Sequence, residues 1–162
     1  MPATRHITPT RSLDRMLRQL RSLLRSHRLP RPDRLVLSTV SGSVTVGFIE
    51  GPAPQRLSAL LLWSLRLDGV SLTWGHPSPD LVHVQLSGRT GSGIRVKAAT
   101  TVTPAELGGH LGTHRGVPVA FLPGGLRLGH LQAETLSLDE LATVVRTALT
   151  VDSPAELTGV AA

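Results

Sequence analysis

The sequence predicts an α+β fold: an antiparallel sheet of about five strands with helices on one face, preceded by a basic amphipathic helix. Apolar residues alternate in several short runs, and those runs are separated by turn-rich segments that suit hairpins. Two further segments have the apolar periodicity and the capping residues of helices. The five strand-like runs are Leu35–Val40, Ser43–Ile49, Val70–Trp74, Leu81–Ser87 and Ile94–Val102.

The first half of the predicted domain contains a hairpin followed by a helix. Ser41 and Gly42 separate the first two strand-like runs, which is typical of a tight hairpin connection. An apolar helix is expected over Ala53–Leu67, with Gly69 as its left-handed cap. The segment Gly75–Asp80 contains two prolines and predicts a loop.

The second half begins with a short predicted helix and ends with a longer one. Thr103–Glu106 has a capping residue, a first-turn proline and an acid, which favours a helix start. A strand is expected over Val117–Leu122. Ser137–Glu140 has the pattern of a capping box and predicts a helix that extends to Leu149.

The N-terminal segment predicts a helix from Thr10 to Arg28, which ends before Pro30. Its apolar residues recur at spacings of three and four, as on one face of an amphipathic helix. These are Leu13, Met16, Leu17, Leu20, Leu23 and Leu24. We therefore divide the chain into a cationic arm and helix over residues 1–33, an α+β domain over 34–150, and a C-terminal tail over 151–162.

Positive charge is concentrated in the predicted arm. The chain has 162 residues and a formal net charge of +6. Residues 1–34 contain nine arginines and two acids, whereas the remainder is close to neutral. The chain has no cysteine, which excludes disulfides and thiolate metal sites. The longest apolar run, Ala59–Trp63, is too short to span a membrane, and Met1–Ser12 lacks the apolar block of a secretory signal. We therefore expect a cytoplasmic protein.

Clustered arginines predict that the helix binds the phosphate backbone of DNA or RNA. The expected contacts are Arg11, Arg15, Arg18, Arg21, Arg25 and Arg28. The apolar stripe on the same helix leaves other interpretations open, in which the helix forms a homodimer, docks on a protein partner or lies on an anionic membrane surface. No cofactor is expected in any of these cases.

A second polar surface is expected on the outer face of the sheet. Alternation places His83 and Gln85 on one strand and Arg95 and Lys97 on the next, opposite the apolar face. None of these positions is aromatic, which disfavours the base stacking typical of sheets that bind single strands. A small enzyme with a site near His83 and Arg95 remains a third interpretation. The chain contains neither a Gly-x-Ser-x-Gly elbow nor a cysteine nucleophile, so we expect a non-catalytic protein.

Two histidines leave a possible metal site open. A spacing of four would place His110 and His114 on one face of a helix, with Glu106 four residues earlier. Two imidazoles can bind a metal if a third ligand converges on them. The glycines at 108, 109 and 112 disfavour that helix.

Several segments of the chain together resemble a family of small uncharacterised actinobacterial proteins, some of which are linked with plasmids and integrative elements. The resemblance rests on Leu60–Trp63, Leu67–Val70, Thr73–Trp74, Val82–Val84, Ser87–Thr90 with Gly93, and Ser137–Leu141. It implies a bacterial cytoplasmic accessory protein and brings no known activity with it.

Overall fold

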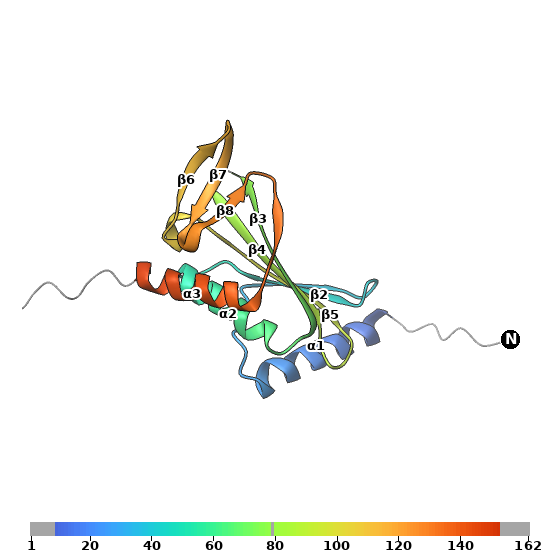
Figure 1. The fold of residues 1–162 in the computed structure, drawn as a ribbon. Helices are drawn as coiled ribbons and strands as arrows, with labels where there is room; N and C mark the ends of the chain where they lie inside the picture. The colour runs from blue at the N-terminus through green and yellow to red at the C-terminus, as the bar shows by residue number, and fades with distance from the viewer. Residues whose placement is uncertain (1–8, 79, 153–162) are drawn as a thin grey trace, which may run out of the picture.

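The computed structural model describes residues 9–78 and 80–152, which form an α+β structure as predicted (Figure 1). Short 3-10 turns at Ala105–Leu107 (η1) and Pro123–Gly125 (η2) join some of the elements. The helices are α1 (Pro9–Ser26), α2 (Ala53–Ser64) and α3 (Leu138–Asp152). The strands are β1 (Arg34–Ser38), β2 (Ser43–Phe48), β3 (Asp68–Ser78), β4 (Leu81–Arg89), β5 (Arg95–Val102), β6 (His110–His114), β7 (Val117–Leu122), β8 (Leu126–Gly129) and β9 (Ala133–Leu136).

The main sheet has six strands in the order β1-β2-β5-β4-β3-β9. Its β2–β5 pair is parallel, with Val44 opposite Val96, and its other neighbouring strands are antiparallel. The expectation of about five strands in a purely antiparallel sheet is therefore wrong. The parallel pair arises because α2 and the β3–β4 hairpin intervene in the chain before β5 returns to lie beside β2. Such long-range pairing leaves no local sequence signal.

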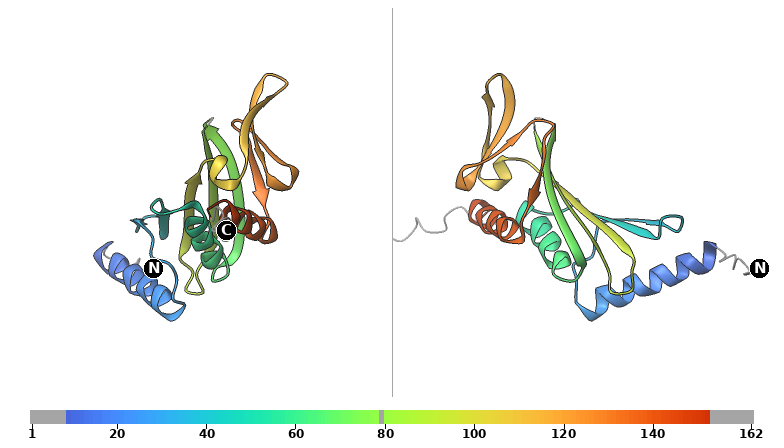
Figure 2. Two further views of the ribbon diagram at one scale, coloured as in Figure 1. Left: turned by 90° about the vertical axis from the view of Figure 1, so that its left-hand side faces the viewer. Right: turned by 45° about the vertical axis from the view of Figure 1, so that its right-hand side comes forward.

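The helices pack on one face of the main sheet and leave its other face uncovered in the part of the chain that the structure describes (Figure 2). Buried residues on the helical face include Val46, Val84 and Leu86. Helix α2 contributes Leu57 and Trp63, both fully buried, to the same core. Alternate residues along β2, β4 and β5 therefore separate a buried face from an outer face, as the strand periodicity predicts.

Helix α1 packs against this body through its apolar stripe. Met16 and Leu20 are buried, and Leu29, just after the helix, is buried with them. The indole Nε1 of Trp63 donates a hydrogen bond to the carbonyl oxygen of Pro30 at 3.1 Å, which ties the segment after α1 to α2. The division at residue 33 stays a prediction. Residues 1–8 and 153–162 lie outside the described residues, and the predicted tail overlaps α3 at residues 151 and 152.

The predicted loop at Gly75–Asp80 is too long, because strand β3 continues to Ser78, although Asp80 does lie in a turn before β4. Gly75 lies opposite His83 on β4 and Ala133 on β9, so pairing on both sides keeps the backbone extended. His76 is fully buried, and its backbone N–H donates to the carbonyl oxygen of Gln132 at 3.3 Å. Tertiary pairing here overrides the local turn propensity.

Strands β6, β7 and β8 form a separate three-stranded antiparallel sheet. The sequence predicted β7 with the observed bounds. It did not predict β6, β8 or β9, of which β8 and β9 have only four residues each. The expected helix after Thr103 is limited to the 3-10 turn η1, because Gly108 adopts a left-handed conformation with φ 75° and ends it.

Candidate functional site

The arginines of α1 lie on the helix face opposite the packed stripe. At 100° per residue, Arg15, Arg18, Arg21 and Arg25 fall within an arc of about 120°. All four side chains are exposed, whereas Met16 on the opposite face is buried. Arg11 lies in α1, but its side chain is outside the part that the structure describes. The structure therefore brings four members of the predicted contact set, Arg15, Arg18, Arg21 and Arg25, together on one exposed helix face.

Arg28 belongs to this region but not to the helix. It follows the end of α1 in a left-handed conformation with φ 50°. The N–H of Leu29 donates to the carbonyl oxygen of Leu24 at 3.1 Å, which is the long hydrogen bond of a Schellman cap. Glycine is favoured at such a position because it has no Cβ. An arginine there carries a steric cost of roughly 1 kcal/mol, which suggests a use for its side chain.

Few carboxylates compete for these guanidinium groups. Among residues 9–78 and 80–152, the one ion pair within 4.0 Å joins Arg56 to Glu106, away from α1. The carboxylate of Asp33 instead accepts backbone hydrogen bonds from Ile49 at 2.7 Å and Glu50 at 2.9 Å. The N–H of Glu50 and, to a smaller extent, the N–H of Ile49 hold the pKa of Asp33 below its ordinary value. Asp14 lies on the arginine side of α1, but it forms no ion pair within that limit with any side chain that the structure describes.

Arginines also line two adjoining hollows beside the C-terminal half of α1. The first has a volume of about 480 Å³ and the second about 590 Å³, and they share Arg21 and Arg25. The first is lined by Arg21, Leu24, Arg25, Leu29, Arg28 and Arg31. Sequence reasoning missed Arg31 as a site residue, because it follows the end of α1 and Pro30, where helical spacing no longer applies. Several permanently charged side chains around one hollow favour an anionic ligand.

The predicted polar sheet face is present, but it is not one compact site. Arg95 and Lys97 are exposed on β5, and His83 and Gln85 are half-buried on β4. Arg95 lies opposite Arg89 at the end of the β4–β5 hairpin. Six residues separate His83 from Arg89 along β4, which is about 20 Å. The structure therefore does not bring His83 and Arg95 together as an enzyme site would require.

The tip of the β4–β5 hairpin lies beside α1 in the views of Figures 1 and 2. Arg89 and Arg95 are exposed at this end of the hairpin. They therefore add positive charge near the arginines of α1. The outer face of the main sheet has no phenylalanine, tyrosine or tryptophan side chain, because Trp74 and Phe48 are buried in the core.

His110 and His114 lie on strand β6 and not on a helix. Four residues along a strand separate two side chains by about 13 Å, too far for both imidazoles to bind one ion. Glu106 is in η1, where its carboxylate accepts hydrogen bonds from Thr103 and Arg56. Within the described ranges, no group of three or more His, Cys, Asp or Glu residues is placed to hold a metal ion.

No protein-family model, curated protein or solved structure matches the chain, so the resemblance to actinobacterial proteins stays a prediction. Of the helices that the structure describes, none has both the length and the apolar character needed to cross a bilayer. The site must therefore be interpreted from its own geometry and charge.

Proposed function

We propose that the protein binds the phosphate backbone of nucleic acid through the arginine face of α1 and the adjoining arginines Arg28 and Arg31. The observation that carries the proposal is the exposure of Arg15, Arg18, Arg21 and Arg25 on one helix face with no carboxylate within ion-pair distance among the described residues. Guanidinium groups are permanently charged and donate paired hydrogen bonds to phosphate oxygens.

The proposed binding is largely independent of sequence. Phosphate contacts fix the position of a protein on nucleic acid but do not read bases. The sheet face beside α1 carries Arg89, Arg95 and Lys97 and has no phenylalanine, tyrosine or tryptophan on which bases could stack. In this proposal the protein is a non-catalytic accessory protein of the cytoplasm.

The stripe of α1 is less available for the alternative function as a docking helix. Met16 and Leu20 are buried against the protein's own core, and Leu23 and Leu24 pack partly against it. A partner that used this stripe would first have to displace the helix from the body. No contact in the described part of the chain favours that step.

Fluorescence anisotropy tests the proposal with two labelled duplexes of unrelated sequence at low salt. Equal micromolar affinity for both duplexes is expected. A parallel sedimentation assay with phosphatidylserine vesicles examines another polyanionic surface that could attract the same arginines. Failure to bind either duplex at low salt would overturn the proposal, and binding to vesicles alone would assign the arginines to a membrane surface instead.

A further inference from the structure

Strand β1 forms an unusually apolar edge of the main sheet. It pairs with β2 on one side, and no described strand pairs with its other side. Its sequence is Arg-Leu-Val-Leu-Ser, in which Leu35 is 42% exposed and Val36 is 47% exposed. The two side chains point to opposite faces of the sheet. The edge therefore presents exposed apolar surface on both faces next to unpaired backbone groups.

The opposite edge of the same sheet is protected in the usual way. Strand β9 has only four residues, and its exposed side chains are those of Ala133, Glu134 and Thr135. The exposed side chains of β9 include a carboxylate and no large apolar group, which disfavours pairing with another chain. By contrast, β1 has three consecutive apolar residues, and neither proline nor lysine interrupts them. An edge of this kind pairs readily with another strand.

The sequence of β1 is complementary to itself in the antiparallel direction. If Val36 faces the same residue of a second copy, Leu35 lies opposite the partner's Leu37, and Arg34 lies opposite the partner's Ser38. Apolar residues then meet apolar residues, and the arginines are kept apart. We propose that β1 pairs antiparallel with β1 of a second copy, about a two-fold axis through Val36, and joins the two main sheets into one.

This symmetry has a consequence for α1. A two-fold axis perpendicular to the joined sheet keeps the helical faces of both copies on the same side. Because α1 packs beside β1, the two arginine-rich helices then flank the axis on that side. The dimer would present two basic helices to one nucleic acid. This last consequence rests on the proposed function, whereas the pairing of β1 does not.

Sedimentation velocity without nucleic acid tests the pairing over a range of micromolar concentrations. The wild-type protein is expected to form a dimer in reversible equilibrium with the monomer. Val36→Lys and Val36→Glu are each expected to be monomeric, because each would place like charges opposite one another across the axis. An equal mixture of the two variants is expected to restore the dimer, since lysine then faces glutamate.

Thr45→Lys is the matched control, because Thr45 is exposed, lies opposite Val36 on β2 and is not at the edge. It should dimerise like the wild type, and thermal melts should show that all variants are folded. A wild-type protein that stays monomeric would overturn the proposal. Dimers that persist in both single variants, or a mixture that stays monomeric, would also overturn it. Because the assay contains no nucleic acid, such a failure leaves the proposed function of α1 unaffected.

Discussion

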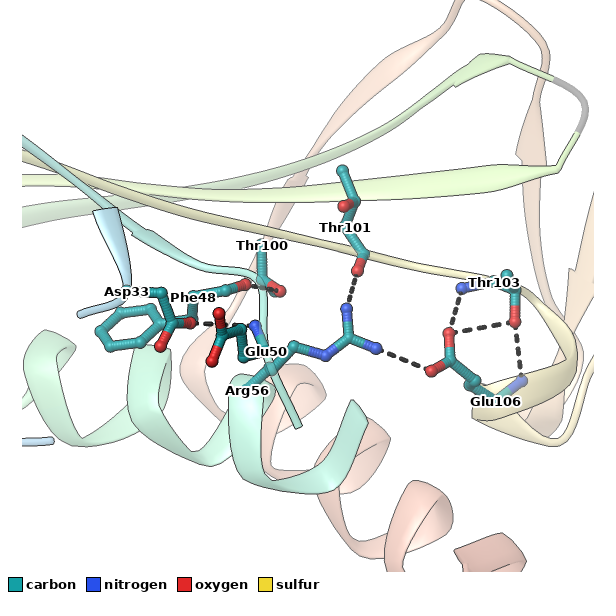
Figure 3. A network of polar contacts seen from close by, with 8 residues as sticks. All are labelled: Asp33, Phe48, Glu50, Arg56, Thr100, Thr101, Thr103 and Glu106. Atoms are coloured by element: carbon teal, nitrogen blue, oxygen red, sulfur yellow. Dashed lines mark hydrogen bonds and ion pairs between the residues drawn. The ribbon is translucent and has the colours of Figure 1, made fainter. Parts of the chain in front are cut away.

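The guanidinium group of Arg56 in α2 and the carboxylate of Glu106 in η1 form an ion pair at 2.7 Å (Figure 3). Arg56 also donates a hydrogen bond to the carbonyl oxygen of Thr101. The second carboxylate oxygen of Glu106 accepts the backbone N–H of Thr103 at 2.7 Å. The pair therefore fastens helix α2 to the end of strand β5 and to the turn that follows it.

Removal of Glu106 should destabilise the fold, because it leaves the buried charge of Arg56 without its partner. We expect Glu106→Ala to lower the free energy of unfolding by about 3 kcal/mol, at the lower end for a buried pair because Glu106 is partly exposed. Combining it with Arg56→Met should recover part of the loss. Urea denaturation measures both changes, and a single variant as stable as the wild type would contradict the assigned role of the pair.

Replacement of Arg28 by glycine should separate stability from function. Glycine adopts the left-handed conformation at φ 50° without a Cβ clash, so Arg28→Gly should stabilise the protein by up to about 1 kcal/mol. The same change removes a cation from the arginine-lined hollow and should weaken nucleic-acid binding. Thermal melts and anisotropy measure the two effects. Lower stability together with unchanged affinity would contradict the interpretation of Arg28.

Neighbouring positions on β4 should differ sharply in their tolerance of charge. Val84 is 1% exposed on the helical face, whereas Gln85 lies half-buried on the outer face. Val84→Asp should cost about 4 kcal/mol or more, because it buries an unpaired carboxylate. Gln85→Asp should cost about 1 kcal/mol or less. Urea melts compare the two variants, and equal losses would mean that β4 does not separate a buried face from an outer one.

Two carboxylates should contribute stability that disappears in acid. The N–H groups of Glu50 and Ile49 lower the pKa of Asp33 from its ordinary value of 3.8, and the N–H and hydroxyl of Ser137 lower that of Glu140 from 4.5. A lowered folded-state pKa stabilises the fold above the ordinary value, and this contribution is lost as the pH falls through the folded-state pKa.

Asp33→Asn and Glu140→Gln should therefore be less stable than the wild type at neutral pH. The difference should shrink as the pH falls through the ordinary pKa values and should vanish below the folded-state values. Chemical denaturation at a series of pH values measures the difference in free energy of unfolding between each variant and the wild type. A difference that stays constant into acid would show that the ionised carboxylates do not contribute in this way.

The sequence predicted the elements whose signals are local. The capping box before α3 is confirmed, since the N–H of Ser137 donates to Glu140 at 2.7 Å and the N–H of Glu140 donates to the Ser137 hydroxyl at 3.2 Å. The stripe of α1 and the alternation of β4 and β5 are also confirmed. Each of these features depends on residues within a few positions of one another.

Features that depend on distant residues could not be predicted in the same way. The parallel pairing of β2 with β5 joins segments about 50 residues apart, with Phe48 opposite Thr100. The extension of β3 through Gly75 depends on β9, which is itself too short for a clear signal. For the candidate site, the sequence predicted the clustered arginines as phosphate contacts. The sequence could not show that the carboxylate of Asp33 accepts backbone N–H groups, or that Arg31 lines the same hollow as Arg28.

The central claim is that the arginines of α1 contact phosphates, and the salt dependence of binding tests it most directly. Each phosphate contact contributes about 0.9 to the slope of log K against log salt. If four arginines make contacts, the wild-type slope should be near −3.6 between about 50 and 200 mM salt. Replacing both Arg18 and Arg25 by alanine should then flatten the slope by about 1.8.

The matched control replaces Arg127 and Arg146 by alanine. These two arginines are exposed, and the elements that carry them, β8 and α3, lie away from α1 (Figure 1). This double variant has the same net charge as the Arg18/Arg25 variant, and its slope should remain close to that of the wild type. The decisive measurement is the anisotropy titration of both double variants on one duplex. A flatter slope in the Arg18/Arg25 variant alone is the expected result. An unchanged slope in that variant, or equal flattening in both, would contradict the assignment of phosphate binding to α1.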